Sequence, residues 1–181
     1  MNILVLLHDK FNDVEFTGFM ACLIRSGKVK GIQYYNPTLK QVTGQFGLTH
    51  LKINDKFQYE LYDAIFIPGG PAAQDLREDK KSLEIVKKFY LDKKYVYAIC
   101  DAPNALYEND IFDEDVRYSS YPMPNLVASR NRTEAMVTVG GDHLITGRCA
   151  MSGVELGIAA VKQLFGEETA KMVELGMRGN N

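Results

Sequence analysis

A cysteine stands where a buried strand meets a helix. Residues 95–99 are apolar and run directly into Cys100, and Pro103 is placed to open a helix. Ala98 and Ala102, two positions before and after the thiol, are small, as a sharp strand-to-helix turn requires because the two backbones nearly touch there. The spacing predicts a nucleophile elbow, in which the helix N-terminus favours the thiolate over the thiol.

Two observations leave a second interpretation of Cys100 open. Cysteine is among the most often buried residue types, so a cysteine at a strand end can be a packing residue. Asp101 is the next residue, and a neighbouring carboxylate disfavours a thiolate. We interpret Cys22 and Cys149 as packing residues, although Cys149 could be a second oxidation site.

Two other strand ends carry candidate partners for the cysteine. Glu15 lies in the first turn of a predicted helix, where the helix dipole favours an acidic residue whatever its role. If Glu15 faces Cys100, its protonated form could donate a hydrogen bond to the thiolate and move protons. A diglycine such as Gly69-Gly70 most commonly marks only a turn. Alternatively, the amide of Gly70, with that of Asp101, could point at an oxyanion formed when Cys100 attacks a carbonyl.

The elements that must position these residues alternate along the chain. Apolar runs typical of strands buried on both faces occupy residues 2–7, 64–67 and 95–99, and a further strand is predicted at 29–36. Apolar residues recur at helical spacing in residues 14–26 and 83–91, which predicts two helices there. The alternation predicts an α/β fold with a doubly wound, mostly parallel sheet flanked by helices on both faces. In such sheets, sites form beyond the carboxyl ends of the strands.

The second half of the chain mixes short β-type pieces with helices. We interpret residues 117–146 as a β-rich insertion, with pieces at 116–119, 126–129, 136–139 and 144–146. Ser152 and Glu155 have capping-box spacing ahead of a helix that closes at Gly166, and a last helix is predicted at 167–177. No repeat or linker divides the sequence, which predicts a single domain over residues 1–181.

Composition excludes several classes of protein. The apolar fraction of 46% suffices for a core without disulfides or a structural metal, and three cysteines without metal-ligand spacing predict no metal site. The net charge of −2, without a basic run, predicts no nucleic-acid partner and no membrane partner. The N-terminal apolar run turns polar at His8, too soon for a signal peptide, so we expect a cytoplasmic protein. Neither a GxxxxGK nor a GxGxxG motif occurs, which argues against a nucleotide binder.

Three segments together resemble a known family. LLHDKFNDVE, ending in Glu15, IPGGPAAQDL and AICDAPNAL are similar in order and spacing to motifs of the DJ-one superfamily, also called ThiJ/PfpI. LITGR and SGVELGIAAVKQLFG extend the resemblance over nearly the whole chain. The resemblance implies a flavodoxin-like fold, a homodimer, and a small pocket on which Glu15, the PGG turn and Cys100 converge. It also implies that Arg148 lies near the cysteine and could bind an anionic substrate or an oxidised sulfur; equally, Arg148 could be a surface arginine before a helix.

The sequence departs from the family pattern at one pocket position. Where many relatives have a histidine before a proline, this chain has Tyr121 in the segment SYPMPN, which could roof the pocket or form a surface turn. His8, at the end of the first strand, is the histidine that could still touch the pocket. A peptidase or glutaminase mechanism is disfavoured without a Cys-His pair, because the amine leaving group needs an acid and the thiol normally needs a base.

Two functions of different classes follow from the resemblance. In the leading hypothesis the protein is a glyoxalase-like or deglycase-like enzyme without a cofactor, whose Cys100 attacks the aldehyde of a small carbonyl substrate such as methylglyoxal. In the alternative it is a redox-sensing or chaperone-like stress-response dimer, in which Cys100 is oxidised to a sulfinic acid capped by Glu15. The absence of the pocket histidine slightly favours this alternative hypothesis over the enzyme hypothesis.

Overall fold

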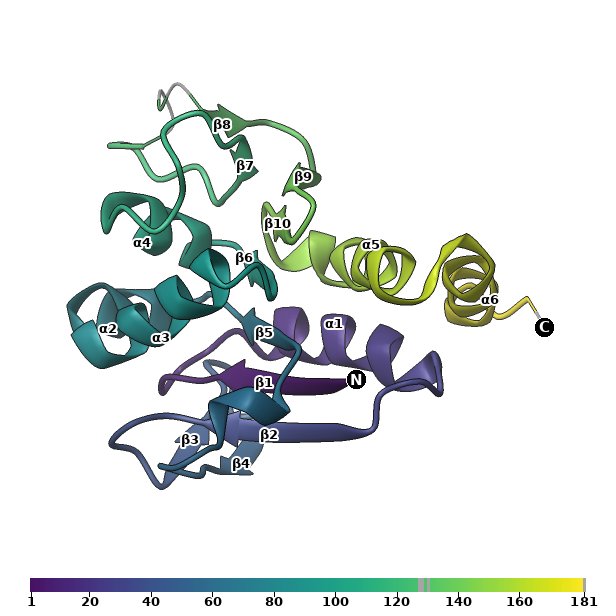
Figure 1. The fold of residues 1–181 in the computed structure, drawn as a ribbon, viewed down its shortest axis with the longest axis horizontal. Coiled ribbons are helices and arrows are strands. Elements are labelled where there is room, and N and C mark those ends of the chain that lie inside the picture. Colours follow the sequence, from purple (N-terminus) through teal and green to yellow (C-terminus); the bar gives the residue numbers. More distant parts are fainter. Residues whose placement is uncertain (127–128, 130, 181) are drawn as a thin grey trace.

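A central β-sheet organises the chain in the computed structural model, which describes residues 1–126, 129 and 131–180 (Figure 1). Its strands are β1 (Asn2–Leu6), β2 (Gly31–Tyr35), β5 (Ala64–Ile67), β6 (Tyr95–Ile99), β9 (Val137–Gly141) and β10 (Leu144–Gly147). Within the described residues their order is β2-β1-β5-β6-β10-β9, and β9 alone runs antiparallel to its neighbour. The mostly parallel sheet predicted from the sequence is confirmed.

Helices cover both faces of this sheet (Figure 1). One face carries α1 (Asp13–Arg25) and α5 (Gly153–Phe165), with α6 (Glu167–Met177) packed on both of them. The other face carries α2 (Ala72–Glu78), α3 (Lys80–Leu91) and α4 (Ala102–Glu108). No helix in the described part of the chain has the length and apolar character that crossing a bilayer demands.

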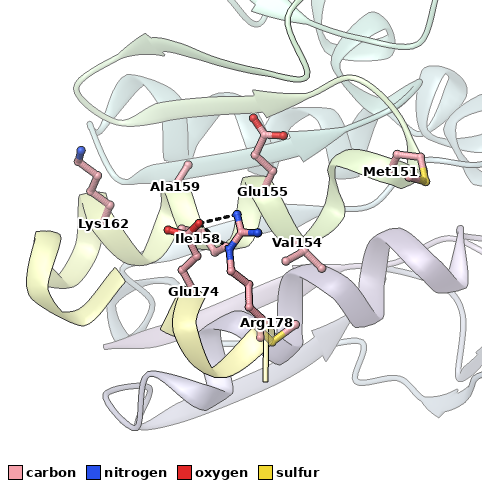
Figure 2. Close-up of a pocket in the computed structure, with 9 residues that line it drawn as sticks. Met151, Val154, Glu155, Ile158, Ala159, Lys162, Glu174 and Arg178 are labelled. Atoms are coloured by element: carbon pink, nitrogen blue, oxygen red, sulfur yellow. Dashed lines mark hydrogen bonds and ion pairs between the residues drawn. The ribbon is translucent and has the colours of Figure 1, made fainter. Parts of the chain in front are cut away.

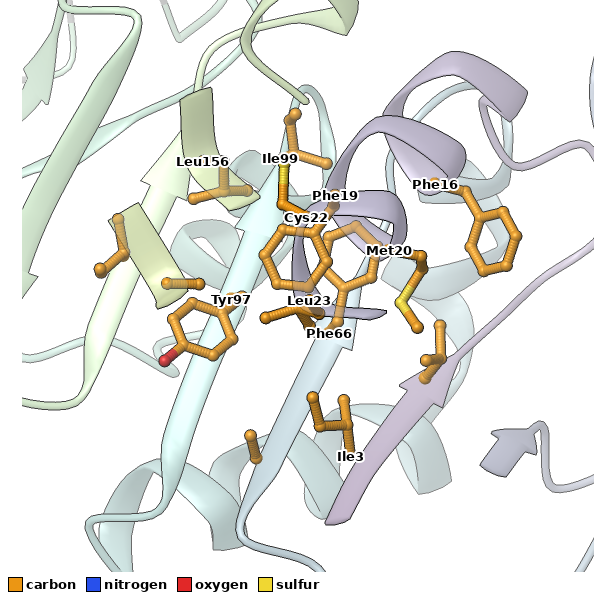
Figure 3. Packing of buried hydrophobic residues seen from close by; sticks show 14 of the residues in the cluster. Ile3, Phe16, Phe19, Met20, Cys22, Leu23, Phe66, Tyr97, Ile99 and Leu156 are labelled. Atoms are coloured by element: carbon orange, nitrogen blue, oxygen red, sulfur yellow. The ribbon is translucent and has the colours of Figure 1, made fainter. Parts of the chain in front are cut away.

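Both faces of the sheet are buried because successive strand residues point to opposite sides. In β1, Ile3 joins the core beneath α1 and α5, whereas Leu4 joins the core beneath α2, α3 and α4. On the α1 side the rings of Phe19 and Phe66 stack with their centroids 3.8 Å apart (Figure 3). Truncating a buried ring of this kind typically destabilises a domain by about 3–5 kcal/mol, so this contact helps to fix α1 over the sheet.

Short elements complete the fold. β3 (Gln41–Thr43) and β4 (His50–Lys52) form an antiparallel hairpin, and β7 (Tyr118–Ser119) pairs with β8 (Arg132–Thr133). Two 3-10 turns occur, η1 (Tyr59–Leu61) and η2 (Ala150–Ser152), within the residues that the structure describes.

The interpretation of residues 117–146 as an insertion is wrong for their second half. β9 and β10 are strands of the central sheet, and β10 pairs in parallel with β6. The reason is burial: all four residues of β10 are buried, so this segment belongs in the core. The predicted piece at 126–129 lies partly outside the described residues, since 127 and 128 are not among them.

The two predicted helix starts have different outcomes. The helix predicted at 14–26 is confirmed as α1, and the side chain of Asn12 caps it by accepting hydrogen bonds from the N–H groups of Val14 and Glu15 at 3.0 and 3.2 Å. The capping box predicted at Ser152 is wrong. The Ser152 hydroxyl donates to the carbonyl of Cys149 at 2.7 Å and accepts from its N–H at 2.9 Å, because η2 precedes α5.

Candidate active site

Cys100 occupies a sharp turn between β6 and α4. Its backbone φ is +64°, in the left-handed region that residues with a Cβ rarely adopt. The backbone holds this conformation, since the N–H of Cys100 donates to Gly147 O at 2.9 Å and its carbonyl accepts from the N–H of Tyr121 at 2.8 Å. Pro103 lies in the first turn of α4, as the sequence predicts. The strand, turn and helix therefore have the geometry of a nucleophile elbow.

The diglycine turn before α2 lies directly against this elbow. A Cβ on Gly69 would lie 2.6 Å from Ile99 O and 2.7 Å from Cys100 Cβ, so a larger residue cannot fit without displacing the elbow. Gly70 has a φ of +83°, which glycine adopts without strain. The close approach brings the backbone N–H groups of Gly70 and Asp101 to the sulfur of Cys100, where both favour the charged thiolate.

Glu15 reaches the same point from the first turn of α1. The residue is fully buried, and its Oε2 accepts a hydrogen bond from the N–H of Gly69 at 2.8 Å. Its Oε1 has no hydrogen-bond partner of ordinary geometry among the described residues, and the carboxyl group interacts with the thiol of Cys100. Because Oε2 already accepts this bond and Oε1 is without a partner in the described part of the chain, a proton on Glu15 is favoured on Oε1.

Burial raises the pKa of both groups, and ionised Glu15 raises the pKa of Cys100 further. Burial raises the pKa of Glu15 to about 7, and the charge of Asp101 adds to the increase, whereas the Cys100 thiol and the Gly69 amide oppose it. Burial, followed by the charge of ionised Glu15, raises the pKa of Cys100 far above its usual value against the Gly70 and Asp101 amides. The predicted thiolate is therefore disfavoured while Glu15 is ionised. Near neutral pH the thiol therefore keeps its proton, while Glu15 is partly protonated and partly ionised.

A pocket of about 300 Å³ opens over the thiol. Its lining residues are Asn12, Gln45, Gly70, Pro71, Gln74, Cys100, Asp101, Tyr121 and Met123. Tyr121, which stands where many relatives have a histidine, lines the pocket with 46% of its surface exposed. The pocket has the size for a small molecule rather than a polymer, and its lining is mainly uncharged.

His8 lies outside this lining. Its Nε2 contacts Oδ2 of Asp79 at 3.0 Å, between α2 and α3. His8 follows Leu4 and Leu6 at two-residue intervals, and both of those leucines face α2, α3 and α4, whereas Glu15 comes from the opposite face. The expectation that His8 touches the pocket is therefore corrected.

Arg148 is also absent from the described lining. Its Nη2 pairs with Oε2 of Glu134 at 2.8 Å, and its Nη1 donates to the carbonyl of Glu134 at 3.0 Å. The side chain is thus held by Glu134, and the expectation that it binds a substrate or an oxidised sulfur beside Cys100 is corrected.

Several residues of the site were missed at the sequence level. Gln45 follows β3, and Gln74 and Arg77 lie on α2, a helix that was not predicted. Arg77 forms an ion pair with Asp101, with Nη2 and Oδ1 2.8 Å apart. The available signal was the spacing of Gln74 and Arg77, which places them on one face of a helix that starts at the PGG turn.

A larger hollow lies elsewhere, between α5 and α6, with a volume of about 610 Å³ (Figure 2). Met151, Glu155 and Lys162 line one side, and Glu174 and Arg178 line the other. The described lining contains no cysteine, serine or histidine. No group of three or more metal-ligating side chains occurs in residues 1–126, 129 and 131–180. The pocket over Cys100 is therefore the candidate active site.

The fold and the pocket define a class of α/β proteins in which a cysteine at a strand-to-helix elbow faces a buried glutamate. The sequence model of the DJ-1/PfpI family matches residues 1–163. The chain belongs to the DJ-1/PfpI family, the superfamily that its motifs resemble.

Relatives span proteins with and without an assigned activity. Uncharacterized protein MG029 of Mycoplasma genitalium is 36% identical, covering 92% of this chain and 97% of its own length. Protein/nucleic acid deglycase 2 of Escherichia coli is 29% identical, covering 81% of this chain and 87% of its own. The crystal structure of Drosophila melanogaster DJ-1beta superposes with a TM-score of 0.82 at 22% identity, covering 98% of this chain and 97% of its own. The structural likeness shows the flavodoxin-like fold.

Proposed function

We propose that the protein is an enzyme that acts on small dicarbonyls without a cofactor, with Cys100 as the nucleophile. The observation that carries this proposal is the buried pair of Glu15 and Cys100: burial raises the pKa of Glu15 to about 7, and its carboxyl group contacts the thiol that lies beneath the amides of Gly70 and Asp101. A relative described as a deglycase adds support for chemistry at a carbonyl group.

The geometry supports a mechanism in which Glu15 moves each proton. Transfer of the thiol proton to Oε1 of Glu15 produces a thiolate, which attacks the aldehyde carbon of methylglyoxal and forms a C–S bond. The carbonyl electron pair moves to oxygen, and the amides of Gly70 and Asp101 stabilise that charge until the oxygen takes up a proton. The product of this step is a hemithioacetal.

The second half of the reaction needs a base and then an acid. Glu15 removes the proton from the carbon bonded to sulfur, which gives an enediol, and a proton is returned to the neighbouring carbon. The resulting thioester is hydrolysed by water to lactate, and the thiol of Cys100 is restored. The net reaction converts methylglyoxal and water to lactate, so no external oxidant or reductant is required.

The test is lactate formation from methylglyoxal by the purified protein. We expect the wild type to form lactate and Cys100→Ala to lose the activity entirely, because the C–S bond cannot form. Cys149→Ala, which changes a half-buried cysteine outside the described lining, is the matched control. Lactate formation that persists in Cys100→Ala would rule out the proposed nucleophile.

Two other activities receive less support from the site. The described lining contains no histidine, so the acid that an amine leaving group needs in peptide hydrolysis has no candidate there. Arg148, which the resemblance implies as a ligand for oxidised sulfur, pairs with Glu134 instead. Mass measurement of the intact protein after mild peroxide treatment tests the redox alternative directly.

The homodimer implied by the resemblance stays a prediction. Met151 borders the hollow between α5 and α6 and, at 83%, is the most exposed of the large apolar side chains among the described residues (Figure 2). We infer that this side of the molecule takes part in the contact between two copies.

A further inference from the structure

An ion pair lies directly beside the candidate nucleophile. Arg77 of α2 and Asp101, the residue after Cys100, form two parallel hydrogen bonds: Nη1 to Oδ2 and Nη2 to Oδ1, both at 2.8 Å. The side chains are 16% and 8% exposed. A fork of this kind is the strongest geometry available to a carboxylate and a guanidinium.

The carboxylate of Asp101 is saturated with donors. Besides Arg77, the side-chain amide of Gln74 donates to Oδ2 at 3.1 Å, and that of Asn104 donates to Oδ1 at 2.9 Å. These bonds hold the carboxylate on α2 and α4, while the backbone N–H of the same residue reaches the sulfur of Cys100. Asp101 thus presents its amide to the sulfur and its charge to Arg77.

The ion pair also joins the two segments that carry the amides. Gly70 lies just before α2, and Asp101 is the N-cap residue of α4. Arg77, near the end of α2, bonds to Asp101 and, through its Nε at 2.7 Å, to Oε2 of Glu108 at the end of α4. The relative placement of the Gly70 and Asp101 amides therefore depends on a contact that Arg77 makes at both ends of α4.

We propose that Arg77 is a positioning residue for Cys100: it neutralises Asp101 and locks α2 to α4, so that both amides stay directed at the sulfur. Charge on the sulfur is then stabilised although an acidic residue follows it in the sequence. The proposal rests on the thiolate role of Cys100 in the proposed function, and not on the identity of the substrate.

Among the described residues, Arg77 is the cation that contacts the carboxylate of Asp101. Glu15 faces the cysteine from α1, and Glu108 faces Arg77 from α4. His8 and Asp79 form a separate pair just after the last residue of α2. Removing the guanidinium leaves a buried carboxylate next to Cys100, and a like charge at such a distance disfavours a thiolate.

The experiment measures the rate of alkylation of Cys100 by iodoacetamide as a function of pH, in a Cys149→Ala background. Cys22 is fully buried, and burial raises its pKa to about 11, so it does not interfere. We expect Arg77→Gln to shift the profile to higher pH and to slow alkylation near pH 7 by about tenfold, which corresponds to one pKa unit. Arg178→Gln, which removes an exposed guanidinium paired with Glu174 away from the site, is the matched control and should stay within about twofold of the wild type.

A second variant keeps the test valid if Arg77→Gln does not fold. Arg77→Gln combined with Asp101→Asn leaves no buried unpaired charge, so its fold is better preserved. We expect the double variant to be alkylated faster than Arg77→Gln, because the unpaired carboxylate is gone, and more slowly than the wild type, because α2 and α4 are no longer locked together. An unchanged pH profile in a folded Arg77→Gln protein, or a double variant that is alkylated as fast as the wild type, would overturn the proposal.

The outcome is separable from that of the proposed function, because alkylation needs no carbonyl substrate. A wild type that forms no lactate while Arg77→Gln slows alkylation refutes the dicarbonyl activity and supports the positioning role. A wild type that forms lactate, with Arg77→Gln unchanged in its alkylation profile, refutes the positioning role alone.

Discussion

The N–H of Gly69 donates to Oε2 of Glu15 at 2.8 Å, and this bond leaves Oε1, which has no hydrogen-bond partner of ordinary geometry among the described residues, as the oxygen free to exchange a proton with Cys100. One hydrogen bond thus joins the turn before α2 to the first residues of α1. It favours Oε1 as the oxygen that exchanges a proton, because Oε2 already accepts from the N–H of Gly69.

Replacing Glu15 by glutamine removes the group that exchanges a proton with the sulfur. We expect Glu15→Gln to lower lactate formation from methylglyoxal by about 100-fold or more, in the range that general acid–base groups contribute. Glu168→Gln, in the exposed first turn of α6, is the matched control and should keep full activity. Activity of Glu15→Gln within a few-fold of the wild type would contradict the assigned role.

The buried carboxyl group of Glu15 makes stability depend on pH. Its pKa is about 7 in the folded protein and about 4.5 as an ordinary glutamate, so the folded state binds the proton more tightly. The stabilisation is complete below pH 4.5 and is lost as the pH rises through 7. The pKa difference corresponds to roughly 3 kcal/mol.

Urea unfolding at pH 5 and pH 8 measures this dependence. We expect the free energy of unfolding of the wild type to decrease between these two values, and Glu15→Gln to show a smaller decrease. An equal decrease in both proteins would assign the dependence to other groups.

A methyl group at Gly69 would collide with the elbow. In Gly69→Ala the new Cβ would lie 2.6 Å from Ile99 O and 2.7 Å from Cys100 Cβ, so the turn or the elbow must move. We expect a loss of about 1–3 kcal/mol in the free energy of unfolding, typical of overpacking, together with slower alkylation of Cys100.

Gly141→Ala is the control for this variant. Nothing lies within 4 Å of a Cβ at that position, so we expect a change of less than about 0.5 kcal/mol there. Normal stability and alkylation in Gly69→Ala would show that the close approach of the two turns is not required.

The predicted homodimer can be tested at Met151. We expect the wild type to elute as a dimer in size-exclusion chromatography with light scattering, and Met151→Asp to shift toward the monomer, because a charge is costly to bury in an apolar contact. Leu48→Asp, at a residue 76% exposed in the loop between β3 and β4, is the matched control. A wild type that is monomeric at high concentration would refute the dimer.

The local elements were determined by the sequence alone. Apolar runs at 64–67 and 95–99 match β5 and β6 residue for residue, and the small residues around Cys100 predict the turn that the structure contains. These features depend on neighbours a few positions away, so that spacing and residue type are sufficient to predict them.

The partners of the polar side chains were decided by the tertiary structure. His8 and Arg148 follow strands whose ends lie near the site, yet their side chains pair with Asp79 and Glu134. The ion pair of Arg77 and Asp101 joins residues that are 24 positions apart on two helices, and nothing in either local segment encodes it. Burial of Glu15 beneath α5 and the PGG turn, which raises its pKa, likewise exists only after packing. Strand and helix periodicity is local, whereas side-chain direction, ion pairing and desolvation depend on which surfaces meet when the chain folds.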